Sequence, residues 1–371
     1  MQPIGLYIHI PFCDGKCPYC DFYSMRGDAP AMDRYTDAVC ASLIRWGRRV
    51  FAPVDTVYFG GGTPTLLGAD RLNRMLAAAR DSFAVAPGAE VTAEANPASA
   101  QEALFCAMRA GGFNRLSMGM QSADADELRF LGRRHTAAQA AAAVRAAYYA
   151  GFENISLDLM IGLRGQTADS LSRSVDFCAA ADVPHVSAYL LKVEPGTAFG
   201  AHADKLALPD EDAQAALYHT VCTALRAHGY GQYEISNFTR PGFASRHNLK
   251  YWHDEPYLGI GPAAHSFLDG RRFYYPRDIR LFESGAEPVG DGSGGDFAEY
   301  AMLALRLTEG LRAAGCRARF GHGIPDAMRR AAQPLVRAGW VRVTDDALAL
   351  TEDGFLLSNA VIGWLLNSLS E

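Results

Sequence analysis

The feature that most constrains the fold is a regular alternation of short apolar runs with helix-like segments between residues 5 and 190. The apolar runs are rich in β-branched and aromatic residues, which is typical of strands; they read GLYIHI, VDTVYF, EVTAEA, RLSMGM, NISLDLM and HVSAYL. Segments rich in Ala, Leu and Arg with helical spacing separate them, at residues 32–49, 69–83, 100–110, 136–150 and 170–181. This alternation predicts an α/β fold with a parallel sheet and right-handed crossovers, either doubly wound or curled into a partial (β/α)6 barrel.

Both architectures bind their ligands at the carboxyl ends of the strands. Three polar residues stand at such ends: Glu94 in EVTAEA, Gln121 after RLSMGM and Asp158 in NISLDL. Taken singly, each is equally well explained as an ordinary helix cap or loop contact. Together they favour a cofactor site at this edge of the sheet.

The pattern changes after about Pro209. A helix-like segment leads into a region rich in Gly, Tyr and Asn that extends to Tyr275, and GDGSGGD then reads as a linker. From Phe297 a helical segment, a hairpin-like pattern and a last amphipathic helix fit a mostly helical, winged-helix-like domain. We therefore expect a barrel over residues 1–208, an extension of it over 209–290 and an accessory domain over 297–371.

The composition restricts the classes of partner. The 371 residues are 49% hydrophobic and 20% charged with a net charge of -6, so there is no basic field for nucleic acid, and no apolar run is long enough to cross a membrane. The opening segment, MQPIGLYIHI, lacks the basic region and cleavage site of a signal peptide and reads as a strand. These features predict a cytoplasmic protein that does not bind nucleic acid.

Three of the eight cysteines lie close together, in the loop PFCDGKCPYC, as Cys13, Cys17 and Cys20. The others stand singly in helix-like or apolar stretches, as expected for buried thiols in a reducing compartment; they are Cys40, Cys106, Cys178, Cys222 and Cys316.

The cluster has three interpretations: structural thiols, zinc ligands or iron-sulfur ligands. Structural thiols need no loop punctuated by Gly and Pro, and zinc would need a second pair of ligands that the chain does not offer. A Cys-x3-Cys-x2-Cys loop can instead bind three irons of a [4Fe-4S] cluster and leave the fourth iron without a protein ligand.

A glycine-rich segment follows the second apolar run. It reads GGGTPT at residues 60–65, where Gly61 and Gly62 let a ligand approach the backbone and Thr63 adds a hydroxyl. A tight turn would explain the glycines as well, so this segment is a modest signal alone.

In the cysteine loop and the order of its elements, the chain resembles the radical S-adenosylmethionine superfamily. That resemblance implies that the amino and carboxylate groups of S-adenosylmethionine chelate the open iron, and that an electron from the reduced cluster cleaves the sulfonium to a 5'-deoxyadenosyl radical. Residues 1 to about 310 resemble the coproporphyrinogen-oxidase-like branch continuously. The segment GRRH contains two arginines, and by residue type Arg134 suits the cofactor contact implied for this segment as well as Arg133 does. The resemblance implies that the cofactor is contacted by Tyr7, Tyr19, Gly61, Gly62, Thr63, Glu94, Gln121, Arg133 and Asp158.

Two subfamilies of this branch are distinguished by short motifs. The oxygen-independent coproporphyrinogen III oxidases carry a fourth cysteine two residues after the third and an extra segment before the first strand, whereas this chain has Phe22 there and begins its first strand near Met1. The HemW-type heme chaperones show CDF after the loop and the motif His-Asn-x-x-Tyr-Trp. This chain has both, since RHNLKYW contains His247, Asn248, Tyr251 and Trp252.

The second motif suits a porphyrin, because an imidazole can ligate heme iron and Tyr and Trp offer flat apolar faces. The alternative is a buried, hydrogen-bonded histidine beside an aromatic turn. His265 in GIGPAAHSF is either a second contact or part of a turn.

The resemblance to the HemW-type chaperones implies a protein that binds heme, a [4Fe-4S] cluster and S-adenosylmethionine. Such a protein passes heme to heme-accepting respiratory proteins. Peripheral contact with membrane proteins is compatible with that role. The alternatives are a radical decarboxylase of coproporphyrinogen III and a radical enzyme with another substrate.

Overall fold

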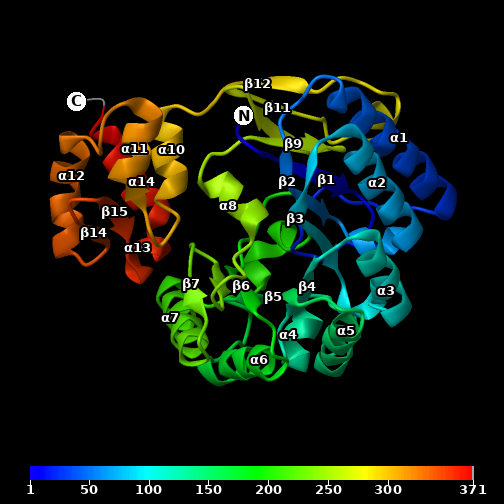
Figure 1. The fold of residues 1–371 in the computed structure, drawn as a ribbon. Helices are drawn as coiled ribbons and strands as arrows, with labels where there is room; N and C mark the ends of the chain where they lie inside the picture. Colours follow the sequence, from blue (N-terminus) through cyan, green and yellow to red (C-terminus); the bar gives the residue numbers. More distant parts are fainter. Residues whose placement is uncertain (370–371) are drawn as a thin grey trace.

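The computed structural model describes residues 1–369 and shows one large curved sheet with a smaller domain beside it (Figure 1). The sheet has twelve strands in the order β12-β11-β10-β9-β1-β2-β3-β4-β5-β6-β8-β7. They are β1 (Ile4–Ile10), β2 (Val54–Gly61), β3 (Val85–Ala95), β4 (Arg115–Gln121), β5 (Asn154–Ile161), β6 (His185–Leu190), β7 (Gly231–Gln232), β8 (Asn237–Thr239), β9 (Tyr257–Ile260), β10 (His265–Leu268), β11 (Arg271–Tyr274) and β12 (Val289–Ser293).

Helices follow the strands, and most of them cover the outer face of the sheet (Figure 1). Their first turns are capped by local side chains: Asp28 accepts a hydrogen bond from Ala31 N at the start of α1, and Thr136 and Thr167 form capping boxes on α5 and α6. The helices are α1 (Ala29–Gly47), α2 (Ala69–Ser82), α3 (Glu102–Gly111), α4 (Ala125–Phe130), α5 (Ala137–Tyr149), α6 (Ala168–Ala180), α7 (Glu211–Ala227), α8 (Arg246–Trp252) and α9 (Ile279–Glu283).

Strands β1 to β6 run parallel, each beside the next, and form a half barrel. In β1 the alternation separates two environments: Ile8 and Ile10 are buried under the helices, whereas Tyr7 and His9 face the inside. The barrel therefore has a polar interior, and the predicted partial barrel is confirmed. We call the carboxyl ends of its strands the mouth and their amino ends the floor.

The sheet continues beyond the half barrel on both sides. Strand β9 pairs parallel with β1, and β10 to β12 follow in antiparallel order, while β8 and β7 extend the sheet from β6. The prediction of a linker at GDGSGGD is wrong for residues 290–293, because they belong to edge strand β12. All five residues of β12 are exposed, so backbone pairing forms this strand and no apolar pattern could reveal it.

The last part of the chain has the element order of a winged helix. Helix α10 is followed by β13, then by helices α11 and α12 and by strands β14 and β15, and the strands pair antiparallel in the order β13-β15-β14, which confirms the expected fold. The boundaries 297–371 stay a prediction, and positions 370–371 lie outside the described residues. No helix within residues 1–369 is both long and apolar enough to cross a bilayer. The elements are α10 (Phe297–Ala304), β13 (Leu311–Arg312), α11 (Ala313–Phe320), α12 (Asp326–Arg337), β14 (Val341–Val343), β15 (Ala347–Leu350), α13 (Glu352–Leu356) and α14 (Ser358–Asn367).

One buried carboxylate, Asp254, joins this domain to the sheet. Its Oδ1 lies 3.1 Å from the guanidinium of Arg272 on β11, and its Oδ2 lies 2.5 Å from that of Arg319 on α11. Arg272 also pairs with Glu299 on α10 at 2.6 Å. Because Asp254 lies just after α8, that short helix, the sheet extension and the C-terminal domain are held at one point.

Candidate functional site

The cysteine loop leaves β1 and folds back on itself at the mouth. Cys13 N donates to Met25 O at 2.9 Å, and Phe199 N, from the loop after β6, donates to Pro18 O at 2.9 Å. The three cysteines of this loop are all partly exposed, whereas four of the other five are buried. The exception, Cys106, is partly exposed on α3.

The donor set of the loop fits a cluster better than a single metal ion. Among residues 1–369 no three His, Cys, Asp or Glu side chains are gathered closely enough to hold one ion. A single zinc would need every sulfur about 2.3 Å from one point, whereas a [4Fe-4S] cube takes each thiolate on a different iron. Cys13, Cys17 and Cys20 lie in one loop, are partly exposed and are not gathered at one point, which is compatible with the second arrangement.

The structure separates the two neighbouring arginines. Arg133 Nη1 donates to Cys17 Sγ at 3.5 Å, and another of its nitrogens donates to Gly119 O on β4. Arg134 points instead to the tip of the loop, where it pairs with Asp14 and stays largely exposed. Of the two, Arg133 therefore lies toward the interior.

The glycine-rich segment is pinned against the end of β1. Gly61 has φ 108°, and a Cβ there would lie 2.4 Å from the ring of His9. A Cβ on Gly62 would lie 2.6 Å from Phe12 O, while its N–H donates to Ile10 O at 2.8 Å. Thr63 places its hydroxyl 3.6 Å from Cys13 Sγ. Both positions therefore need glycine, and they bring the backbone directly to the cysteine loop.

Two carboxylates, from strands β3 and β5 on either side of β4, face the interior. Glu94 accepts hydrogen bonds from Tyr58 Oη and Gly61 N, both at 3.0 Å, and Asp158 accepts one from Ser117 Oγ at 3.2 Å. Burial, and then the charge of Asp158, raise the pKa of Glu94 to about 7; burial raises the pKa of Asp158 to about 6. Two carboxylates in a confined polar space suit a cationic ligand.

Gln121 ends β4 with a strained backbone. Its φ is 71°, which a non-glycine residue adopts at a cost of about 1–3 kcal/mol. Such strain persists where the surroundings enforce a geometry, and here it fixes a nearly buried amide at the mouth, beside Arg133.

The two predicted tyrosines have different surroundings. Tyr7 bonds His9 Nδ1 at 3.1 Å and stacks on Tyr58 with the ring centroids 6.2 Å apart. Tyr19 lies beside Cys17 and packs against Phe199, with the ring centroids 6.2 Å apart.

A small apolar cluster that the sequence did not predict lies behind Tyr19. It consists of Leu131, Leu163, Leu191, Phe199 and Leu206, with Tyr19, Phe130, Met160, Val193 and Leu208 at its edge. The five buried residues come from the separate segments that follow β4, β5 and β6, so no local pattern marks them. They give the cysteine loop an apolar wall.

Helix α8, formed by RHNLKYW, closes the floor of the half barrel (Figure 1). Glu90 on β3 caps it, accepting hydrogen bonds from the N–H groups of Arg246 and His247 at 3.1 and 3.0 Å. Lys250 is buried and pairs with Asp55 at 2.9 Å and Glu255 at 3.0 Å. The helix is thus tied to the barrel by charges at both ends.

His247 points from α8 into the barrel and is 1% exposed. Its Nδ1 lies 2.8 Å from Thr56 Oγ1, its Nε2 lies 2.8 Å from Tyr251 Oη, and its ring stacks on Tyr58 at 5.1 Å. Burial, then Lys250 and Arg115, lower the pKa of His247 to about 3, so the imidazole is neutral. Both ring nitrogens are therefore hydrogen-bonded in this arrangement.

The other motif residues lie on the same helix. Asn248 N donates to Ser245 Oγ in the first turn, and Tyr251 packs edge-to-face on Tyr257 with the ring centroids 4.6 Å apart. Trp252 faces the C-terminal domain, where Arg306 lies 5.9 Å from its ring centroid. Trp252 is thus directed away from the barrel interior that His247 enters.

Over almost its full length the chain is similar to proteins named heme chaperone HemW. It is 41% identical over 381 aligned positions to that of Mycobacterium tuberculosis, which covers 98% of this chain and 95% of the relative. With the HemW of Bacillus subtilis the identity is 34% over 381 positions, which covers 98% and 99% of the two chains. The chain belongs to the HemW family of heme chaperones.

Models of its two parts agree with this assignment. Residues 7–178 match the Radical SAM superfamily, and residues 297–357 match the HemN C-terminal domain. Coproporphyrinogen III oxidase (HemN) from Escherichia coli shares the fold, with a TM-score of 0.84, 22% identity and coverage of 98% of this chain and 90% of that one. The predicted family is therefore confirmed, and the HemN likeness shows the fold alone.

His265 lies outside the floor in this HemW-family chain. It begins β10, is exposed, and stacks on Tyr274 with the ring centroids 5.3 Å apart. The loop before it starts at Gly261, which lies against His9 O near the mouth. It therefore does not share the surroundings of His247.

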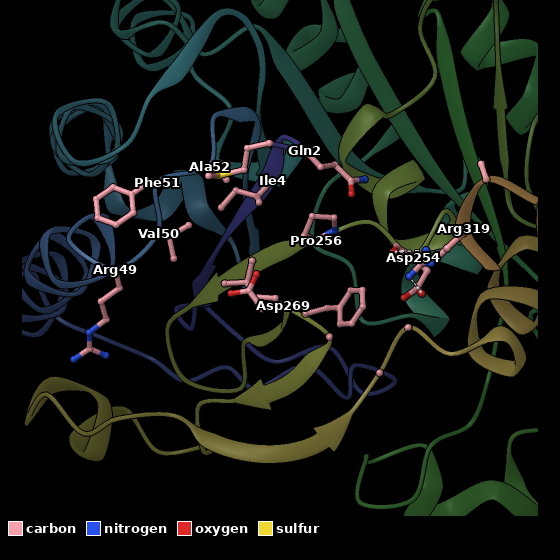
Figure 2. A pocket seen from close by; sticks show the side chains of 17 residues that line it. Gln2, Ile4, Arg49, Val50, Phe51, Ala52, Asp254, Pro256, Asp269 and Arg319 are labelled. Carbon is pink, nitrogen blue, oxygen red and sulfur yellow. Dashed lines mark hydrogen bonds and ion pairs between the residues drawn. The ribbon is translucent and has the colours of Figure 1, made fainter. Parts of the chain in front are cut away.

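Cavities occur both beside the site and away from it. One of about 280 Å³ adjoins the cysteine loop and includes Asp14, Thr63 and Arg134 in its lining. Another, of about 740 Å³, lies near the start of β1 and is bordered by Phe51 and by the Asp254–Arg319 pair (Figure 2). None of the predicted site residues lines the second cavity.

Proposed function

We propose that this HemW-family protein binds heme and passes it to heme-accepting proteins. The protein acts in the cytoplasm, its acceptors are respiratory enzymes, and it transfers heme during peripheral contact with membrane proteins. The observation that carries this proposal is the placement of the imidazole of His247 and the phenol of Tyr251 by one short helix inside the barrel. Full-length relatives named heme chaperones support it.

The cofactor part of the proposal assigns Cys13, Cys17 and Cys20 to a [4Fe-4S] cluster. When bound, the cluster with S-adenosylmethionine supplies reductive cleavage of the sulfonium. The chain's own residues bind and orient: the carboxylates of Glu94 and Asp158 offer negative charge to the cationic groups of S-adenosylmethionine. The apolar wall at Phe199 keeps water from one side of the loop.

The remaining predicted contacts surround this space. Backbone groups of the glycine segment, the hydroxyls of Thr63 and the two tyrosines, and the side chains of Gln121 and Arg133 supply polar contacts around it. The cofactor contacts that we propose are Tyr7, Tyr19, Gly61, Gly62, Thr63, Glu94, Gln121, Arg133 and Asp158.

For heme, we propose Nε2 of His247 as the iron ligand. Nδ1–H can donate to Thr56 Oγ1 and so fix the tautomer, which leaves the Nε2 lone pair for the metal. Iron would replace the hydroxyl of Tyr251, which is one hydrogen bond within α8. Heme binding by this route requires α8 to shift, with Asn248, Tyr251 and Trp252 moving as part of it.

The test compares two histidines with matched surroundings. His185 on β6 is also buried, with Nδ1 2.7 Å from Ser156 Oγ and Nε2 2.8 Å from Tyr233 Oη, but it lies outside the motif. In heme titrations of the anaerobically purified protein, His247→Ala should change the Soret band and weaken heme binding about tenfold or more, because an iron–nitrogen bond is lost. His185→Ala should leave both unchanged.

Equal spectra for wild type and His247→Ala would remove His247 as the ligand. Wild-type protein that binds no heme but converts coproporphyrinogen III to protoporphyrinogen would overturn the proposed function in favour of the decarboxylase.

A further inference from the structure

Arg115, the first residue of β4, is a charged side chain inside the barrel that none of the assignments above uses. It is 2% exposed and is the largest of the fully buried side chains. Leu116 and Met118 alternate with it toward the helices, whereas Ser117, two residues on, bonds the inward carboxylate of Asp158. Arg115 therefore points into the interior from the floor.

The guanidinium of Arg115 has no partner. Its Nε is buried without a hydrogen bond, and no ion pair or side-chain hydrogen bond of Arg115 exists within the part of the chain that the structure describes. A guanidinium carries five N–H donors, and an unpaired buried charge is strongly unfavourable. Other buried cations here are paired, as Lys250 is with Asp55 and Glu255.

Groups of both proposed sites surround Arg115. Its charge lowers the pKa values of Glu94 and Asp158 against the effect of burial, and it adds to the lowering by burial of the pKa values of His185 and His247. In the sheet register Arg115 lies opposite Thr92 on β3, two residues nearer the floor than Glu94, and its charge acts on groups of both proposed sites. Neither carboxylate comes within ion-pair distance of it.

Toward the mouth, the next inward positions of β4 above Arg115 are Ser117 and Gly119, which carry little bulk of their own. The side-chain nitrogens of Gln121 and Arg133 lie over Gly119, 2.8 and 2.9 Å from where a Cβ would stand. A ligand group that reaches Arg115 therefore lies on the floor side of these two side chains.

We propose that Arg115 is the receptor for a carboxylate of the ligand that enters the barrel, and that this carboxylate is a propionate of the heme. The inference rests on the proposed function. A guanidinium binds a carboxylate through two parallel N–H···O bonds, and an interior of low dielectric strengthens that pair. A heme held at the floor by His247 carries two such groups on one edge.

The methionine carboxylate of S-adenosylmethionine has the same chemistry, and Arg115 could also serve only as a counter-charge for Glu94 and Asp158. Both alternatives predict an effect on S-adenosylmethionine. The propionate assignment predicts an effect on heme that disappears when the propionates are esterified.

The experiment is a cycle with two proteins and two ligands. Heme and heme dimethyl ester are titrated into the cluster-loaded wild type and Arg115→Gln, and S-adenosylmethionine affinity is measured for both. We expect Arg115→Gln to weaken heme binding about tenfold, to leave the dimethyl ester unaffected, and to leave S-adenosylmethionine unaffected. Non-additive effects of the substitution and the ester identify the pair.

Arg115→Lys keeps the positive charge but cannot donate two parallel hydrogen bonds to one carboxylate, so it should retain only part of the heme affinity of the wild type. The urea midpoint of Arg115→Gln should not fall, because the substitution removes an unpaired buried charge. If that variant does not fold, equal binding of heme and its dimethyl ester by the wild type suffices to overturn the inference. Heme affinity unchanged in Arg115→Gln, or S-adenosylmethionine affinity lost with it, also overturns it. A wild type that binds no heme would instead be a failure of the proposed function.

Discussion

The mouth and the floor of the half barrel are both polar, but their polar groups are used differently. At the mouth the thiols of Cys13, Cys17 and Cys20 stay partly exposed, and Gln121 holds a strained backbone. At the floor the side chains of α8 are paired: His247 has two hydrogen bonds and Lys250 two carboxylates. The difference teaches that the mouth presents polar groups that a ligand can still contact, whereas α8 is held to the floor by groups that are already paired.

The largest expected effect is at the cysteine loop. Replacing Cys13, Cys17 or Cys20 with Ala should abolish the visible iron-sulfur absorption of the anaerobically reconstituted protein, because each thiolate holds its own iron. Circular dichroism should show that the fold persists, since none of the three belongs to the buried core. Cys106→Ala is the matched control, being partly exposed on α3; a loss of absorption there would contradict the assignment.

Substitutions at the floor should change the stability of the protein and not the binding of the iron-sulfur cluster. Lys250→Met keeps most of the apolar stem but removes a buried ammonium that pairs with Asp55 and Glu255, and it should lower the free energy of unfolding by about 3 kcal/mol. Lys192→Met, on an exposed pair with Glu194, should change it by less than about 1 kcal/mol. Urea denaturation measures both, and similar values would show that α8 is not anchored as described.

The smallest expected effect concerns the electrostatics of the mouth, through the pH dependence of stability. The pKa of Glu94 is about 7 in the folded protein against 4.5 ordinarily, so the folded state binds the proton more tightly. Stability is then fully present below pH 4.5 and is lost as the pH rises toward 7. Each pKa unit corresponds to about 1.4 kcal/mol, and because residue Glu94 is only partly buried, the expected total is about 1–2 kcal/mol.

Glu94→Gln should remove this component of the pH dependence in the cofactor-free protein. Urea denaturation between pH 4.5 and 7 measures it for both proteins. A slope that is the same in the variant would assign the dependence to other groups.

Much of the half barrel was predictable, because its elements carry local patterns. All six apolar runs are strands, and the helix predicted at 69–83 is α2 at Ala69–Ser82. Helix ends differ from the prediction where a capping side chain sets the first turn. Asp28 caps α1, which therefore begins at Ala29 and not at the predicted residue 32. The six short strands β7 to β12 were not predicted, since they form by pairing with distant strands.

The candidate site was predictable only where the motif is local. Spacing alone drew attention to the cysteines, and strand ends to Glu94, Gln121 and Asp158. Phe199 and Arg115 were missed because their roles depend on which loops and strands meet in space. The motif at 246–252 was recognised, but its burial in the floor depends on Thr56 and Glu90, far away in the sequence.

Strand β1 lies between β2 and β9 and so depends on two very different parts of the chain. Its partner β2 begins at Val54, whereas β9 spans Tyr257–Ile260. During synthesis one edge of β1 therefore stays unpaired until about 250 further residues have left the ribosome. Contacts of such sequence separation form late, because loop closure opposes them. The strand that carries the cysteine loop is consequently completed near the end of folding, so cluster insertion into a finished mouth has to follow synthesis of most of the chain.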